Sequence, residues 1–103
     1  MSYSKYLISA NKYVFSAYNV WEGANIDTIR LLPIDEFGNK LIIVIIDCFS
    51  RFVMLYQAKD CKASSAADAL LHCIGMFGAP AQLLSDNGSQ YVNKIINELL
   101  HIV

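Results

Sequence analysis

The residues best suited to chemistry are two aspartates that lie far apart in the sequence but in similar surroundings. Asp86 follows the strand-like residues 82–85 and precedes Asn87-Gly88, a dipeptide typical of tight turns. Asp27 lies inside an apolar segment, residues 26–32, although aspartate is disfavoured within strands. A carboxylate at the carboxyl end of a strand stands where open α/β sheets bind their ligands.

Two such carboxylates on neighbouring strands could hold divalent metal ions. Bare carboxylates about 4 Å apart repel each other by about 4 kcal/mol at an effective dielectric near 20, and a bound cation removes that penalty. Two metal ions roughly 4 Å apart can activate an attacking oxygen and stabilise a leaving group in phosphodiester chemistry. An aspartate before Asn-Gly is also a common turn residue, so a purely structural role for Asp86 stays open.

Hydrophobic periodicity predicts the strands that would position these aspartates. We expect strands over residues 25–32, 40–47, 52–58 and 82–85. Short connections make the first three an antiparallel meander, and the continuous aliphatic run of the second suggests a central strand. Residues 1–20 carry aromatic side chains without a clear period, so we expect an irregular lead-in there and a single partial domain over residues 21–103.

Two helices complete a βββαβα order, the pattern of an α/β fold. The first should be capped by Ser64 or Ser65 and end at Gly78. Its helical spacing predicts one apolar face: Ala66, Leu70, Ile74 and Phe77. The second should cover residues 93–103, with an apolar stripe formed by Ile95, Ile96, Leu99, Leu100 and Val103.

Composition excludes several classes of protein. With 103 residues the chain is at most one domain, and its 55% hydrophobic residues exceed the roughly 45–50% of globular proteins, so it must bury a core. The longest apolar run, residues 41–46, is far shorter than the ~20 residues of a membrane span, and no signal region opens the chain. We therefore expect an intracellular protein, nuclear if it functions on DNA. The net charge of −1 argues against nucleic-acid binding through bulk positive charge.

The cysteines and histidines form no recognisable metal or disulfide pattern. Three cysteines, Cys48, Cys61 and Cys73, are widely spaced without a CxxC motif. His72 and His101 do not complete a zinc site. We interpret the cysteines as small buried or half-buried side chains.

From about residue 21 to residue 100 the chain resembles the catalytic core of retroviral and LTR-retrotransposon integrases, above all those of gypsy-type elements. The matching stretches are residues 25–29, Leu32-Pro33 with 35–40, 45–53, and 77–91. Each stretch alone is a weak signal, since an Asp-Asn-Gly turn is common. Together, in this order and at suitable spacings, they make a specific one.

The resemblance implies a ribonuclease H-like mixed sheet and a site of two aspartates and one glutamate that binds two Mg²⁺ or Mn²⁺ ions. Asp27 would be the first of these catalytic and metal-binding carboxylates, and Asp86 the second. A DNA-contacting loop would follow, formed by Asn87, Gly88, Ser89 and Gln90. Such enzymes process the 3′ ends of element DNA and transfer them to target DNA, usually as homo-oligomers. Asp47 matches a frequent aspartate of the family that is not a ligand, so we expect a turn or polar-contact role for it.

The chain departs from the family pattern at several positions. The expected glutamate would lie on a later helix, past Val103, and Glu98 is too close to Asp86 to replace it. The zinc-binding module that normally precedes the core is absent, and residues 21–24 are unusual for the family. We therefore interpret the chain as a truncated integrase core, inactive as written, with an uncovered sheet edge and face that would make it fold poorly alone. The alternative is a domesticated noncatalytic module that binds nucleic acid or protein. A third possibility, an unrelated ligand-binding α/β domain, lacks a phosphate-binding glycine loop.

Overall fold

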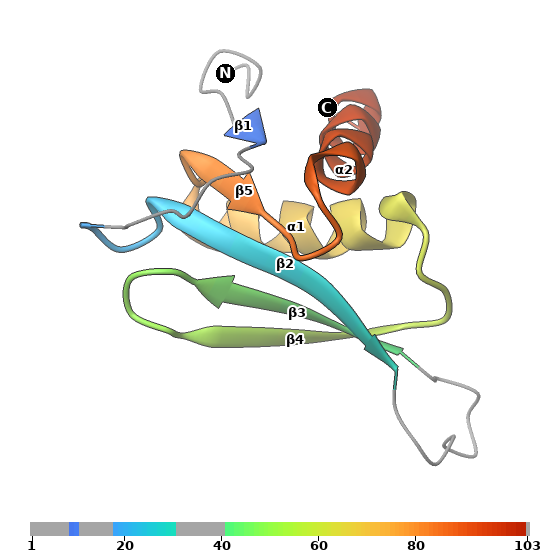
Figure 1. Ribbon diagram of the computed structural model, residues 1–103, viewed down its shortest axis with the longest axis horizontal. Coiled ribbons are helices and arrows are strands. Elements are labelled where there is room, and N and C mark those ends of the chain that lie inside the picture. Colours follow the sequence, from blue (N-terminus) through green and yellow to red (C-terminus); the bar gives the residue numbers. More distant parts are fainter. Residues whose placement is uncertain (1–8, 11–17, 31–40, 103) are drawn as a thin grey trace.

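A computed structural model gives the fold of residues 9–10, 18–30 and 41–102, and the account below is confined to them (Figure 1). The elements follow the order β1 (Ser9–Ala10), β2 (Gly23–Arg30), β3 (Leu41–Asp47), β4 (Val53–Ala58), α1 (Ala63–Phe77), β5 (Gln82–Leu84) and α2 (Ser89–Ile102). The strands form one sheet in the order β1-β5-β2-β3-β4. Strands β2, β3 and β4 are the antiparallel meander that the sequence predicts, and β5 joins β2 in parallel.

Strand boundaries agree with the prediction to within two residues where the structure describes them. The first strand of the meander begins at Gly23 rather than Asn25, and β5 ends at Leu84, one residue before the predicted end. The predicted last two residues of the first strand, the turn after it and Lys40 lie outside the described residues.

The expectation of an irregular segment over residues 1–20 is wrong at β1. This two-residue strand pairs in parallel with β5, Ser9 beside Gln82 and Ala10 beside Leu83. The edge of β5, which we expected to be uncovered, therefore has a short neighbour from the N-terminal part of the chain. The other edge of the sheet is β4.

The core lies between one face of the sheet and the two helices. Figure 1 shows α1 running behind the strands, with α2 beside it. Alternate strand residues point toward the helices and are buried there, among them Ile26 and Ile43. The helices contribute the remaining fully buried core side chains of this layer: Ala66, Ala67, Leu70, Cys73, Val92 and Ile95. Packing of these apolar groups holds the helix layer against one face of the sheet.

The opposite face of the sheet is apolar and no described helix packs on it. Three rows of paired residues cross β2, β3 and β4 on this face. The rows are Ile29-Ile42-Gln57, Asp27-Val44-Leu55 and Asn25-Ile46-Val53. Of their aliphatic members Ile29, Val53 and Leu55 are exposed to solvent. Asp27 is thus the single acidic residue in a largely aliphatic surface.

Helix α1 begins without the predicted serine cap. Its N-cap residue is Lys62, which makes no side-chain cap hydrogen bond. Just before the helix, Asp60 Oδ1 accepts hydrogen bonds from the Lys62 N–H at 3.0 Å and from the Ser65 hydroxyl at 2.7 Å. The pKa of Asp60 lies below its ordinary value because these bonds, above all the one from Ser65, favour the charged form. At the other end Gly78 stops the helix with φ 82°, as the sequence predicts. Phe77, predicted on the buried face, is exposed.

Helix α2 begins at Ser89, four residues earlier than predicted. Gly88, with φ 91°, turns the chain directly into the helix, so no extra loop separates the turn from it. Val92, Ile95 and Leu99 form its buried stripe. Leu100, predicted to belong to this stripe, is exposed because the buried positions follow the spacing of three and four from Val92. Neither helix of the described chain is long and apolar enough to cross a bilayer.

Candidate functional site

The parallel pairing of β2 with β5 brings Asp27 and Asp86 to the same place. Gly23 pairs with Gln82 and Asn25 with Leu84. The same offset, continued past the end of β5, puts Asp86 beside Asp27, and neighbouring strands lie about 4.8 Å apart. Both predicted acidic residues therefore lie where the parallel strand meets the meander.

Hydrogen bonds fix the Asp27 carboxylate from both sides. Its Oδ1 accepts a bond from the Ser85 hydroxyl at 2.8 Å and one from the Asp86 N–H at 3.2 Å. Its Oδ2 accepts a bond from the Asn25 side-chain amide at 2.6 Å. Asn25 and Asp27 share a face because side chains two apart on a strand point the same way. The end of β5 is thus tied to the middle of β2 through one half-buried carboxylate.

The loop after Asp86 is compact and exposed. Ser85 Oγ accepts a bond from the Asn87 N–H at 3.1 Å, and Ser85 O accepts one from the Gly88 N–H at 3.1 Å. Asp86, Asn87, Gly88 and Gln90 are exposed, and Ser89 is partly buried. Since Ser89 opens α2, the positive end of that helix dipole lies beside the two aspartates.

The donor set suits a hard divalent cation. Mg²⁺ takes oxygen ligands and is often bound by one or two carboxylates together with water and substrate phosphates. The exposed Asp86 and the half-buried Asp27 supply such carboxylates, with the Ser85 hydroxyl and Asn25 amide next to them. Ligation by Asp27 would require the carboxylate to exchange one of its present hydrogen bonds for the metal. The residues therefore fit a two-carboxylate metal site.

A third acidic ligand is not found within the described part of the chain. No group of three or more histidine, cysteine, aspartate or glutamate residues is close enough there to hold a metal ion. Glu98 lies more than two turns along α2 from Ser89 and is exposed.

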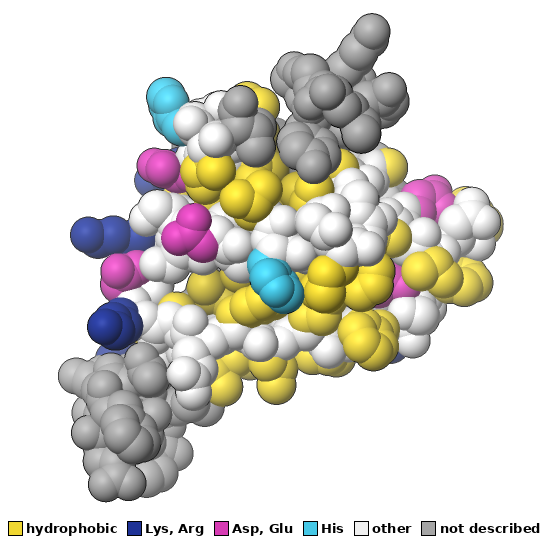
Figure 2. Space-filling view, turned by 180° about the vertical axis from the view of Figure 1, so that it is seen from behind, with side chains coloured by type: hydrophobic (Ala, Val, Ile, Leu, Met, Phe, Trp, Pro, Cys, Tyr) yellow, Lys and Arg dark blue, Asp and Glu magenta, His cyan; other side chains and the backbone are white. Residues whose placement is uncertain are grey.

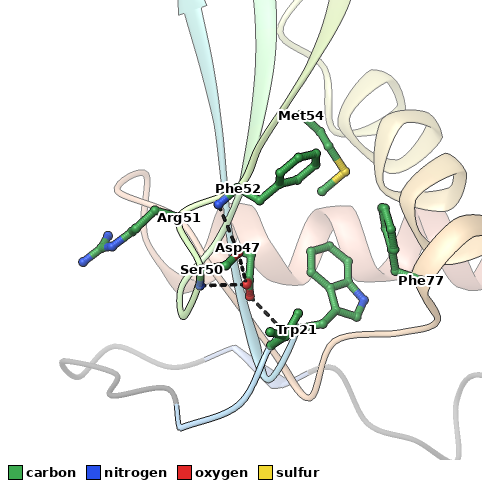
Figure 3. A pocket seen from close by; sticks show the side chains of 8 residues that line it. Trp21, Asp47, Ser50, Arg51, Phe52, Met54 and Phe77 are labelled. Carbon is green, nitrogen blue, oxygen red and sulfur yellow. Dashed lines mark hydrogen bonds between the residues drawn. The ribbon is translucent and has the colours of Figure 1, made fainter.

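Asp47 has the structural role that the sequence predicts. It ends β3 and is 2% exposed. Its Oδ1 accepts the Trp21 N–H at 2.8 Å, and its Oδ2 accepts the Ser50 N–H at 2.9 Å and hydroxyl at 2.6 Å (Figure 3). Burial alone would raise the pKa of Asp47, but these bonds outweigh burial and hold the pKa below its ordinary value. Asp47 is therefore an ionised anchor for the β3–β4 turn.

Tyr56, His72 and Cys73 form a cluster that resembles a nucleophile beside a base, but the pKa values of its thiol and its phenol are raised. The Tyr56 hydroxyl lies 2.8 Å from His72 Nδ1 and 3.1 Å from Cys73 Sγ. Burial raises the pKa of the Cys73 thiol, and burial with the bond to Cys73 raises the pKa of Tyr56 to about 12. Thiolate and phenolate are therefore disfavoured, and the cluster packs β4 against α1.

All three cysteines are free, as the sequence predicts. Cys73 is buried and Cys48 partly buried, but Cys61 is exposed, which contradicts the predicted burial. Cys61 precedes α1 in an exposed turn, where no element covers it.

Sequence reasoning missed the two neutral residues that hold Asp27. Asn25 had a usable signal, because it stands two positions before Asp27 on the same strand. Ser85 had none, because its contact depends on the register between β2 and β5. That register is set by tertiary packing and is absent from local patterns.

A mixed sheet built from an antiparallel meander and a parallel strand, with carboxylates where they join, defines a ribonuclease H-like α/β protein. The integrase core domain family matches residues 17–103. The chain belongs to this family, as its resemblance to integrases predicted.

Individual relatives agree with this assignment. The chain is 38% identical over 63 residues to the Gag-Pol polyprotein of avian reticuloendotheliosis virus and 39% identical over 64 residues to the Gag-Pro-Pol polyprotein of Mason-Pfizer monkey virus. These alignments cover 60% and 61% of the chain but only 6% and 4% of the polyproteins. Human gypsy retrotransposon integrase-like protein 1 is 17% identical over 96 residues, 93% of the chain and 18% of that protein.

A solved structure shows the same fold. A chain of a simian T-cell lymphotropic virus intasome, solved by cryo-electron microscopy in complex with PP2A regulatory subunit B56 gamma, matches with a TM-score of 0.55 and 26% identity. The match covers 77% of this chain and 31% of the intasome chain. The present chain therefore spans a small part of the length of the proteins that it matches.

Proposed function

We propose that Asp27 and Asp86 are the first two acidic ligands of a metal-dependent site that processes DNA ends and transfers DNA strands during integration. The observation that carries this proposal is the contact of Ser85 Oγ and the Asp86 N–H with Asp27 Oδ1. In this contact Asp86, just past the end of β5, is next to Asp27 in the middle of β2. Membership of the integrase core family supports the reaction class.

Bound Mg²⁺ or Mn²⁺ would supply activation of the attacking oxygen and stabilisation of the leaving group. Asp27, held by Asn25 and Ser85, is the rigid ligand of the pair. Asp86 is exposed and would face the DNA. Asn87, Gly88, Ser89 and Gln90 form the adjoining loop, whose backbone N–H groups and helix dipole favour a phosphate.

Efficient strand transfer needs a third acidic ligand, because two carboxylates leave the second metal ion poorly positioned relative to the attacking oxygen. The described residues offer none beside Asp27 and Asp86. We therefore propose that these residues alone bind metal weakly and turn over DNA poorly. A noncatalytic module that binds nucleic acid or protein on this fold is the second candidate function.

Manganese titration tests the metal site without requiring activity. Mn²⁺ should selectively broaden the amide NMR signals of residues 85–88, and substitution Asp27→Asn or Asp86→Asn should weaken binding more than tenfold by removing a nearby charge. Asp68→Asn, at an exposed position of α1, is the matched control and should leave the broadening unchanged. Equal broadening in all three variants would refute the metal site.

DNA binding separates the two candidate functions. Fluorescence anisotropy of a labelled duplex, with and without Mg²⁺, should show a metal-dependent part that both Asp27→Asn and Asp86→Asn abolish. A binding module would keep its affinity in both variants and would not respond to Mg²⁺. Self-association, which the resemblance also implies, is a separate proposal that light scattering on the same samples would test.

A further inference from the structure

A cavity of about 580 Å³ lies next to the start of β2. It opens between the β3–β4 turn and the end of α1, and Figure 3 shows the rings around it. Three aromatic side chains, Trp21, Phe52 and Phe77, line it together with Met54 and the carboxylate of Asp47. Phe52 and Phe77 are 59% and 52% exposed, so this aromatic rim faces solvent. Figure 2, seen from the side of α1, shows hydrophobic side chains gathered on this face of the molecule.

The tryptophan of this rim is held from three directions. Its indole Nε1–H donates to the carbonyl of Gly78, and its ring packs on Phe77 with centroids 5.9 Å apart at 59°. Its backbone N–H donates to Asp47 Oδ1 at 2.8 Å. Trp21 is therefore fixed before any ligand arrives, which lowers the entropic cost of binding.

Unusual backbone conformations concentrate at the same place. Within the described ranges, Trp21 with φ 64° and Arg51 with φ 66° are the two non-glycine residues of positive φ, and both line the cavity. The two N–H groups donate to Asp47, one to its side chain and one to its carbonyl. Strain of this kind persists only where the surroundings hold it, and it gathers at functional sites.

One acidic and one basic residue, Asp47 and Arg51, line the cavity. Asp47 is almost completely buried and accepts hydrogen bonds from neutral N–H and O–H groups, so no cation neutralises it among these contacts. Arg51 also lines the cavity, but its side chain points away from the rings in Figure 3. A purely apolar ligand would leave the carboxylate without an opposite charge.

We propose that this cavity binds an alkylated ammonium group, such as the head of trimethyllysine or choline, between Trp21, Phe52 and Phe77 and next to the Asp47 carboxylate. Faces of aromatic rings attract such cations, and the methyl groups fill apolar space that a bare ammonium would not. The proposal is independent of the proposed metal site, which lies at the middle of β2.

The chain contains a single tryptophan, so its fluorescence and its indole N–H NMR signal report on this cavity alone. We would titrate the protein with Nα-acetyl-trimethyllysine amide and with the neutral isostere in which carbon replaces the charged nitrogen. The cation should bind about three- to thirtyfold more tightly than the isostere. A parallel titration with choline distinguishes two sources of the ammonium group. Tighter binding of the lysine derivative indicates a modified protein side chain as the natural ligand, whereas tighter binding of choline indicates a free small molecule.

Matched phenylalanine variants locate the binding. Phe52→Leu and Phe77→Leu should each weaken binding of the cation about threefold or more, since each removes one ring from the cage. Phe49→Leu is the control, because Phe49 is 50% exposed but does not line the cavity. Equal affinity for the cation and its isostere would overturn the proposal. So would unchanged affinity in both cage variants, with circular dichroism confirming that they are folded.

Discussion

Replacing Asp47 by asparagine should destabilise the fold more than any other conservative change of an aspartate in the described residues. Asp47 accepts three hydrogen bonds from Trp21 and Ser50 while only 2% exposed. Asparagine keeps one acceptor oxygen and replaces the other by an amide that itself donates. Whichever way the amide turns, a partly buried N–H of Trp21 or Ser50 then faces another donor.

The cost follows from the number of bonds affected. A hydrogen bond to a charged group contributes about 1.5–3 kcal/mol, and a buried donor without an acceptor costs about 1–3 kcal/mol. Loss of one such bond, with partial relaxation of the turn, gives an expected destabilisation of about 2–3 kcal/mol. For a domain of this size that corresponds to a fall in Tm of roughly 10–20 °C.

Thermal and urea unfolding followed by circular dichroism would measure this change. The control is Asp60→Asn, because Asp60 also accepts two hydrogen bonds but lies in an exposed turn before α1. Its effect on Tm should be much smaller, since water can replace the lost partner. If Asp47→Asn lowers Tm no more than Asp60→Asn, the anchoring role of Asp47 is wrong.

Three further predictions concern pH, glycine and the uncovered sheet face. The folded-state pKa of Asp47 is lowered from 3.8, so the ionised carboxylate contributes its full stabilisation above pH 3.8, and this stabilisation is lost as the pH falls through the folded-state pKa. Urea midpoints measured from neutral pH downward should therefore fall at acidic pH in the wild type, and should fall less in Asp47→Asn. Gly75→Ala, inside α1 with open space around its Cβ position, should stabilise by about 0.5–1 kcal/mol, whereas Gly78→Ala, at φ 82°, should destabilise by about 1–3 kcal/mol; chemical unfolding would contradict this if both changes had the same sign. Leu55→Lys, at a position 61% exposed, should change stability by less than about 0.5 kcal/mol and reduce light scattering of concentrated samples, and unchanged scattering would argue against self-association through this face.

The sequence predicts the meander and the two helices because their signals are local. The aliphatic run of β3 and the helical spacing in α1 are strong enough to survive without tertiary information. β1 escapes prediction because two residues carry no period, and its pairing depends on β5, which is far away in sequence. The start of α2 was misplaced because its first turn is polar, so an apolar stripe marks the helix only from Val92 onward.

The two aspartates of the candidate site were also predictable, but their surroundings were not. Asp27 stands out because strands seldom contain aspartate, and Asp86 because it precedes a turn. The contact of Ser85 with Asp27 depends on the register between β2 and β5, which local patterns do not contain. The aromatic rim of the cavity was hidden for another reason. Helical spacing assigned Phe77 to the core, whereas Phe77 is the last residue of α1 and is 52% exposed.

The parallel pairing of β2 with β5 also bears on the order of folding. The β2-β3-β4 meander joins segments that are close along the chain, whereas the β2–β5 pair must close a loop that contains two strands and a whole helix. Loop-closure entropy favours the local pairs, so we expect the meander to form before β5 docks. Asp27 would then lie on a preformed strand before Ser85 and Asp86 contact it. Partial opening at β5 would separate the two carboxylates while leaving most of the sheet intact.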